Sequence, residues 1–180
     1  MTPPRAYFLL RSPHQIEFMR ILVENIKDVR TGIVMMVNRP YVSLSMGKHS
    51  KQELSDWIDE NRNYEPSWTL LGYAFTLARG MLTLEKSKHK SIILFSDGDP
   101  DKCRTDECEE FLEYDQLIEA YECREQGMQL LYIMVGTTID EQRAIDVAGG
   151  VQNTVSVGDF HNLDVSILKE VVSTLCRPQL

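Results

Sequence analysis

The sequence predicts an α/β protein with a doubly wound, mostly parallel six-stranded sheet, helices on both faces and one antiparallel edge strand, in the Rossmann-like manner. Short apolar runs alternate along the chain with longer segments of helical periodicity, which is the order of parallel strands joined by helices. The run 91–95 is apolar and β-branched, as expected of a strand buried on both faces. Only residues 38–40 separate two of the apolar runs, and so short a link requires an antiparallel pair.

Strands are expected where a short apolar run ends at a turn signal. The run 91–95 stops at Ser96-Asp97-Gly98, where the glycine permits a sharp turn. Residues 41–46 alternate apolar and polar side chains, which is typical of a strand exposed on one face, so they are assigned to the sheet edge. The expected strands are residues 6–10, 31–37, 41–46, 91–95, 128–135 and 151–157.

Helices are expected where apolar residues recur at helical spacing behind a capping residue. Ser50 and Glu53 have the spacing of a capping box. Gly72 and Gly80 interrupt an apolar helix, and each is expected to mark close packing, because glycine costs about 1 kcal/mol against alanine in a helix. The expected helices are residues 13–26, 50–61, 67–84, 109–126, 138–148 and 163–175. For the helix 109–126 the expected buried side consists of Phe111, Leu112, Leu117, Ile118 and Tyr121.

Length and charge restrict the class of protein. The 180 residues suit a single domain covering 1–180. The net charge of −8 argues against a nucleic-acid partner and gives no reason to expect an anionic membrane, although a local basic patch remains compatible with it. No apolar run approaches the roughly 20 residues that span a bilayer, so membrane insertion is not expected.

The compartment is left open between two interpretations. The amino-terminal residues lack the apolar segment of a signal peptide, and the favoured expectation is an extracellular or secreted domain excised from a larger protein, with a cytoplasmic protein as the alternative. The four cysteines permit two disulfides or four free thiols. Cys103 and Cys108 lie in one polar loop and could form a local disulfide.

The candidate site lies at the carboxyl end of the central strands, which is where open α/β sheets bind ligands. Asp97 directly follows the buried run 91–95, although an aspartate here could also simply cap a turn. Asp97, Asp99 and Asp101 alternate like calcium ligands, but Lys102 and Cys108 occupy the positions where that loop needs glycine and glutamate. The three carboxylates are therefore interpreted as loop residues that could face a basic partner.

Four segments carry a resemblance to a known family. They are 92–98 (IILFSDG), 69–75 (TLLGYAF), 31–34 (TGIV) and 132–136 (YIMVG). In order and spacing the chain resembles the von Willebrand factor type A family, also called the integrin I-like family, over nearly its whole length. The resemblance implies protein binding or cell adhesion through loops at the top of the sheet, in many members with a divalent cation held at a metal-ion-dependent adhesion site.

The metal site of that family is degenerate in this sequence. Thr69 and Asp97 match two of the family's ligands, but Arg11, Pro13 and Gln15 stand where the family has an aspartate and two serines. We therefore expect no bound metal, with weak Mg²⁺ binding at Asp97 and Thr69 as the alternative. The hypothesis is that Arg11 pairs with Asp97 in place of the cation; alternatively, Arg11 points to solvent and Asp97 caps its turn.

The function expected from the resemblance is non-enzymatic binding of a protein ligand at the top face. The alternatives are a structural or scaffold domain inside a larger assembly, and an α/β hydrolase that uses Asp97 with Asp99 or His14. The sequence contains no nucleophile elbow, phosphate loop or dinucleotide fingerprint, which argues against the enzyme. The expected ligand-binding residues are Arg11, Ser12, His14, Gln15, Trp68, Thr69, Asp97, Asp99 and Asp101.

Overall fold

The structure is a computed structural model in which part of the chain is described. It describes residues 18–22, 25, 29–36, 39–61, 70–96, 114–136, 139–159, 162 and 165–175, and the backbone alone of residues 5–10.

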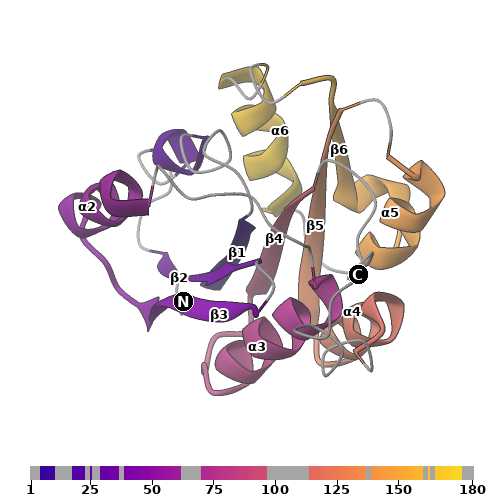
Figure 1. Cartoon of the computed structure of the whole chain (residues 1–180), viewed down its shortest axis with the longest axis horizontal. Coiled ribbons are helices and arrows are strands. Elements are labelled where there is room, and N and C mark those ends of the chain that lie inside the picture. The colour runs from indigo at the N-terminus through magenta and orange to yellow at the C-terminus, as the bar shows by residue number, and fades with distance from the viewer. Residues whose placement is uncertain are drawn as a thin grey trace.

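The strands form one sheet in the order β3-β2-β1-β4-β5-β6 (Figure 1). β3 pairs with β2 in the antiparallel sense and all other pairs are parallel, as the short link 38–40 predicted. The order changes direction between β1 and β4, so these strands lie side by side at the centre. The bounds are β1 Arg5–Leu10, β2 Arg30–Met35, β3 Tyr41–Gly47, β4 Lys90–Ser96, β5 Met128–Val135 and β6 Thr154–Val157.

Helices cover both faces of the sheet (Figure 1). The helical residues 18–22 lie with α2 and α6 on one face, and α3, α4 and α5 lie on the other. A short 3-10 turn, Val151–Asn153, leads into β6, where the sequence predicted a strand from residue 151. The helices are α2 Lys51–Asn61, α3 Leu71–Thr83, α4 Gln116–Glu125, α5 Glu141–Ala148 and α6 Val165–Leu175.

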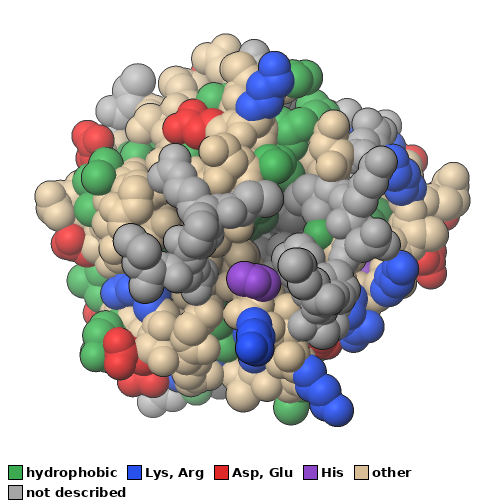
Figure 2. Space-filling model, turned by 180° about the vertical axis from the view of Figure 1, so that it is seen from behind, with side chains coloured by type: hydrophobic (Ala, Val, Ile, Leu, Met, Phe, Trp, Pro, Cys, Tyr) green, Lys and Arg blue, Asp and Glu red, His purple; other side chains and the backbone are tan. Residues whose placement is uncertain are grey.

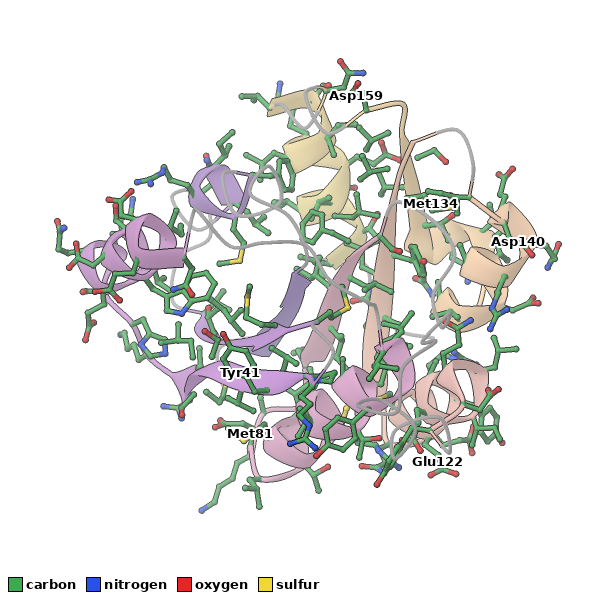
Figure 3. All side chains as sticks on the ribbon, in the orientation of Figure 1. Tyr41, Met81, Glu122, Met134, Asp140 and Asp159 are labelled. Carbon is green, nitrogen blue, oxygen red and sulfur yellow. The ribbon has the colours of Figure 1, made fainter. Side chains whose placement is uncertain are left out.

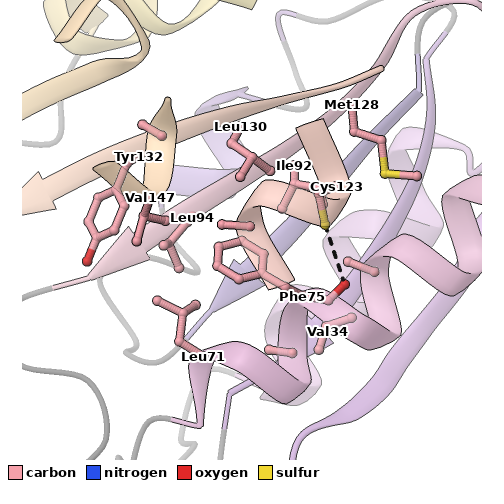
Figure 4. Close-up of a cluster of buried hydrophobic side chains, with 14 of the residues drawn as sticks. Val34, Leu71, Phe75, Ile92, Leu94, Cys123, Met128, Leu130, Tyr132 and Val147 are labelled. Atoms are coloured by element: carbon pink, nitrogen blue, oxygen red, sulfur yellow. Dashed lines mark hydrogen bonds between the residues drawn. The ribbon is translucent and has the colours of Figure 1, made fainter. Parts of the chain in front are cut away.

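Two apolar cores result, one on each face of the sheet. On the first face Phe18 meets Phe95 edge to face, with ring centroids 5.6 Å apart. On the second face Phe75 of α3 packs among residues of β4, β5 and α4 (Figure 4). β4 and β5 contribute side chains to both cores, which explains why their sequences are apolar at nearly every position.

Cys123 lies within the second core and is free. Its Sγ donates a hydrogen bond of 3.9 Å to the carbonyl oxygen of Phe75 (Figure 4). Burial raises the pKa of this thiol to about 12. Because Cys123 is unpaired, the arrangement with two disulfides does not occur. Cys103 and Cys108 lie outside the described residues.

The predicted capping box at the start of α2 is confirmed. The Ser50 backbone N–H donates to Glu53 Oε2 at 2.7 Å, and the Glu53 N–H donates to Ser50 Oγ at 3.2 Å. These bonds favour the charged carboxylate and hold the pKa of Glu53 below its ordinary value. On the side of α2 that faces the sheet, Leu54, Trp57 and Ile58 are buried.

The buried side predicted for the helix 109–126 is wrong. The described helix, α4, begins after Asp115, whose carboxylate accepts hydrogen bonds from the N–H groups of Leu117 and Ile118. Its core side consists of Gln116, Ala120 and Cys123, and Leu117, Ile118 and Tyr121 are exposed. Small side chains face the core because α4 packs closely between α3 and α5. Phe111 and Leu112 lie outside the described residues.

The two glycines of α3 differ in their surroundings. A Cβ on Gly72 would lie 2.6 Å from the carbonyl carbon of Tyr114 and closer still to its oxygen, which confirms close packing. A Cβ on Gly80 would meet nothing within 4 Å, so the same prediction for Gly80 is wrong. α3 itself begins at Leu71, four residues later than expected.

Candidate functional site

The candidate site lies where the parallel strands end, here called the carboxyl edge. Leu9 of β1 is the register partner of Leu94 of β4, so β1 ends at Leu10 beside the end of β4. Ser96, the last residue of β4, is the partner of Met134 in β5 and is fully buried. The order of the sheet reverses between β1 and β4, and in open α/β sheets ligands bind at the carboxyl ends of the strands at such a switch point.

The residues predicted to bind a ligand lie outside the described residues. Arg11, Ser12, His14 and Gln15 follow Leu10 directly, and Trp68 and Thr69 precede Leu70. Asp97, Asp99 and Asp101 follow Ser96. The described strands and helix thus establish where each of the three segments meets the sheet.

The start of α3, which directly follows Thr69 and Leu70 in the sequence, is closely packed. Leu70 and Leu71 are buried, and no side chain caps the first turn of α3. The backbone of Gly72 lies against the carbonyl of Tyr114, and the rings of Tyr73 and Tyr114 meet edge to face with centroids 5.0 Å apart. The start of α3 is therefore packed against the segment that precedes α4.

The described part of the carboxyl edge includes residues that the sequence reasoning did not select. Tyr41 begins β3 beside Met35, the last residue of β2, and is 47% exposed. Asp140 caps α5 by accepting a hydrogen bond of 3.0 Å from the Arg143 N–H. Gly136, at φ 111°, donates its N–H to the Val157 carbonyl at 2.8 Å and so joins the ends of β5 and β6. Period-two patterning could not identify Tyr41, because it says nothing about how far a strand end projects.

The described residues of this edge are dispersed. In Figure 3 Tyr41 lies well away from Asp140 and Asp159, which follow β5 and β6. No group of three or more His, Cys, Asp or Glu residues suited to a metal ion occurs in the described part of the chain. The described residues of this edge therefore do not form one compact cluster.

The donor set at the family's metal position does not fit a dication. One hydroxyl and one carboxylate match, at Thr69 and Asp97, while Arg11 supplies a cation and Pro13 supplies no polar side-chain group. Mg²⁺ is held by several oxygen ligands that include carboxylates. A guanidinium placed beside the remaining carboxylate would oppose a second positive charge there.

Comparison with known proteins finds similar solved structures. No family model matches the chain, and no curated protein matches it. Proximal thread matrix protein 1 from the mussel byssus, solved with a zinc-occupied MIDAS motif, superposes with a TM-score of 0.79 at 19% identity, covering 97% of this chain and 46% of that one. The chain thus spans about half the length of the mussel protein.

Two further solved structures superpose on nearly the whole chain. The manganese-loaded TRAP protein of Plasmodium vivax gives a TM-score of 0.73 at 15% identity, over 97% of this chain and 74% of that chain. The pilus adhesin SpaC of Lactobacillus rhamnosus GG gives 0.72 at 10% identity, over 97% and 31%. At such identities the likeness concerns the fold alone. The chain therefore has the fold of a von Willebrand factor type A domain.

Proposed function

We propose that the chain is a non-enzymatic module that binds a protein ligand through the loops of the carboxyl edge, and that it does so without a bound metal. The observation that carries the proposal is the register of β1 and β4. It brings Leu10 and Ser96 to adjoining ends of central strands, and the next residues in the chain are Arg11 and Asp97. Neighbours with the same fold include a thread matrix protein and a pilus adhesin, which supports an interaction role.

The absence of a metal is argued from charge. Neighbouring strands lie about 4.8 Å apart, so a long guanidinium side chain beginning after one strand can reach a carboxylate beginning after the other. We propose that Arg11 and Asp97 form this pair. It would occupy the place that a cation takes in related domains and present a preformed, hydrogen-bonded surface to a ligand.

The described titratable groups with displaced pKa values have structural roles. Active sites commonly contain side chains whose pKa values are displaced by several units. Among the described residues, the groups with a clearly displaced pKa are Glu53 and Cys123, and both have structural causes in a capping box and in core burial. Neither lies on the carboxyl edge.

We also propose that the domain works outside the cell as part of a larger protein, with a cytoplasmic setting as the alternative. No helix among the described residues has the length and apolar character that crossing a membrane requires. A thiol count in denaturant on protein from its native source separates the two settings. One disulfide among the cysteines other than Cys123 would support an oxidising compartment, and a full set of free thiols would support a reducing one.

Ligand binding is tested with the immobilised domain and extract or serum from the native source. Asp97→Arg reverses a charge on the carboxyl edge, and Glu170→Arg makes the same change on an exposed position of α6. We expect a partner that the wild type and Glu170→Arg retain and that Asp97→Arg loses, with or without EDTA. A partner retained by all three proteins would point to a scaffold role through another surface.

The metal is tested by rebuilding the missing donors. The variant Arg11→Asp/Pro13→Ser/Gln15→Ser restores one carboxylate and two hydroxyls, and Arg39→Asp changes the charge equally in the β2–β3 link. We expect Mg²⁺ or Mn²⁺ to raise the melting temperature of the rebuilt variant and to leave the wild type and Arg39→Asp unchanged. Stabilisation of the wild type by either ion would contradict metal-free binding.

A further inference from the structure

The outward side of α4 carries a group of exposed apolar side chains. Leu117, Ile118 and Tyr121 are 38%, 61% and 51% exposed, and they are three of the seven large apolar side chains that are exposed in the described part of the chain. Tyr121 follows the other two by four and three residues, so it adjoins both on the helix surface. Apolar side chains exposed singly are ordinary, whereas adjoining ones mark a candidate contact surface. We call Leu117, Ile118 and Tyr121 the α4 patch.

The α4 patch is held in a fixed position. The opposite side of α4 is buried in the second core. The Arg124 guanidinium lies 6.0 Å from the centre of the Tyr121 ring and donates a hydrogen bond to the Val147 carbonyl of α5. Because this guanidinium is bonded to α5, the Tyr121 ring has a fixed neighbour. A surface that is ordered before binding loses less conformational entropy when a partner covers it.

Acidic side chains lie one helix turn from the α4 patch. Asp115 precedes Ile118 by three residues, and Glu122 follows Ile118 by four. Glu125 follows Tyr121 by four residues. Residues at these spacings are neighbours on a helix surface. Glu122 lies at the outer rim of the molecule in Figure 3, and Asp115 and Glu125 are exposed. The apolar side chains are therefore flanked by carboxylates.

Basic residues do not cancel the negative charge on this face of the sheet. Helices α3, α4 and α5, with the capping residues Asp115 and Asp140, contain seven acidic residues, three arginines and no lysine. Each arginine is engaged within the fold: Arg79 with two acids of α4 at 2.7 and 3.3 Å, Arg124 with a carbonyl of α5, and Arg143 with a buried glutamine. The excess of acid on these helices therefore remains.

The same imbalance extends through the sequence that leads into α4. Residues 97–126 contain twelve acidic and three basic residues. The rest of the chain contains 15 acidic and 16 basic residues and is close to neutral. On the face shown in Figure 2, acidic and basic side chains occur together. The net charge of −8 therefore originates in the stretch that contains the α4 patch.

These charges decide between the possible occupants of the α4 patch. A second copy of the chain would bring like charges together, and a stable dimer buries about 800 Å² on each partner, far more than three such side chains supply. Anionic lipids and nucleic acids are repelled for the same reason. A protein segment that places apolar side chains on the patch and lysine or arginine beside them matches both the apolar centre and the acidic surroundings.

We propose that the α4 patch and its flanking carboxylates bind a basic, apolar segment of a partner protein. Ile118 and Tyr121 supply the buried centre of this contact, and Asp115, Glu122 and Glu125 supply its charged rim. The proposal does not rest on the protein ligand proposed for the carboxyl edge. With both contacts, the domain would join two proteins.

The test is binding of a fluorescent peptide of about 14 residues, built from leucine and lysine with the leucines at helical spacing. Fluorescence anisotropy with the 180-residue chain measures its Kd. Matched peptides have serine in place of leucine, or glutamate in place of lysine, and we expect neither to bind. Binding of the leucine–lysine peptide should weaken as salt is raised.

Two variants of α4 and two matched variants of α6 locate the contact. We expect Ile118→Ser to raise the Kd about tenfold, and Val165→Ser, at an apolar position exposed to a similar degree, to change it less than about twofold. We expect Glu125→Lys to raise the Kd about fivefold, and Glu170→Lys to change it less than about twofold. All four substituted side chains are exposed, so unchanged melting temperatures will show that the variants remain folded.

Several results would overturn the proposal. Equal binding of the serine peptide would show attraction by charge alone, and equal losses in the α4 and α6 variants would show that the peptide binds elsewhere. No binding of the leucine–lysine peptide would overturn it too. A wild-type dimer in sedimentation that Ile118→Ser converts to a monomer would assign the α4 patch to a second copy instead. The carboxyl edge is tested separately with Asp97→Arg, so either proposal can fail alone.

Discussion

The two glycines of α3 allow one substitution to be tested in two environments of the same helix. Gly72→Ala places a Cβ 2.6 Å from the Tyr114 carbonyl carbon and closer to its oxygen, whereas Gly80→Ala places one in open space. Real Cβ atoms essentially never approach backbone atoms within 3.0 Å. Because the obstacle is backbone, it cannot rotate away as a flexible side chain would, and the segment before α4 must shift.

The expected changes in the free energy of unfolding have opposite signs for the two variants. Overpacking a tight contact costs about 1–3 kcal/mol, and replacing glycine by alanine in a helix gains about 0.5–1 kcal/mol. For Gly72→Ala the overpacking exceeds the gain, because the backbones of two segments must separate, and we expect a net loss of about 2 kcal/mol. For Gly80→Ala the helix gain remains alone, about 0.5–1 kcal/mol.

Thermal denaturation and urea denaturation, both followed by circular dichroism, measure the stability of the two variants. In a domain of this size 1 kcal/mol corresponds to about 2–4 °C, so Gly72→Ala should melt about 4–8 °C lower than the wild type and Gly80→Ala about 1–4 °C higher. Unchanged m values would show that the denatured states are comparable. A Gly72→Ala protein as stable as the wild type would refute the close approach of Tyr114 to α3.

Three further predictions follow from charges. Between pH values of about 9 and 12 the unfolded chain loses the Cys123 proton while the folded chain retains it, so the free energy of unfolding falls as pH rises. At about pH 10.5 the loss is about 2 kcal/mol. Urea titrations should find this loss in the wild type and not in Cys123→Ala. Arg79→Ala leaves the half-buried carboxylate of Glu119 without this counter-charge and should lower the free energy of unfolding by about 2 kcal/mol. Arg20→Ala removes the partner of the more exposed Asp59 and should lower it by less than about 1 kcal/mol. If Arg11 pairs with Asp97, exchanging the two residues should recover at least about 1 kcal/mol relative to the sum of Arg11→Asp and Asp97→Arg, and strict additivity would contradict the pair.

Residue patterns predicted the structure correctly where a few neighbouring residues were sufficient to define an element. The capping box at Ser50 and Glu53 and the antiparallel link 38–40 need only neighbouring residues, and both are as expected. The α4 helix shows where this fails. Leu117, Ile118 and Tyr121 have helical spacing, yet they face solvent, because the buried side of α4 is decided by the distance to α3 and α5.

The candidate site, too, could be predicted from the sequence only in part. Asp97 is predicted because it follows a buried strand, and Arg11 because the family resemblance puts a metal ligand at its position. The register of β1 with β4 brings the two strand ends together. The exposure of Tyr41 and the row formed by Arg30, Arg5 and Lys90 depend on strands far apart in sequence, and no pattern within one segment predicts them.

By itself the sequence determined the class of fold and the order of its elements, because each depends on residue type at a local spacing. The loss of an acidic ligand at Arg11 stays a prediction that the family resemblance implies. The tertiary structure alone decided that Gly72 is crowded while Gly80 is not, that Cys123 is held unpaired in the core, and that Arg30, Arg5 and Lys90 of three strands share one edge of the sheet. These depend on which segments become neighbours, and that is settled by the packing of the whole sheet rather than by any one stretch of chain.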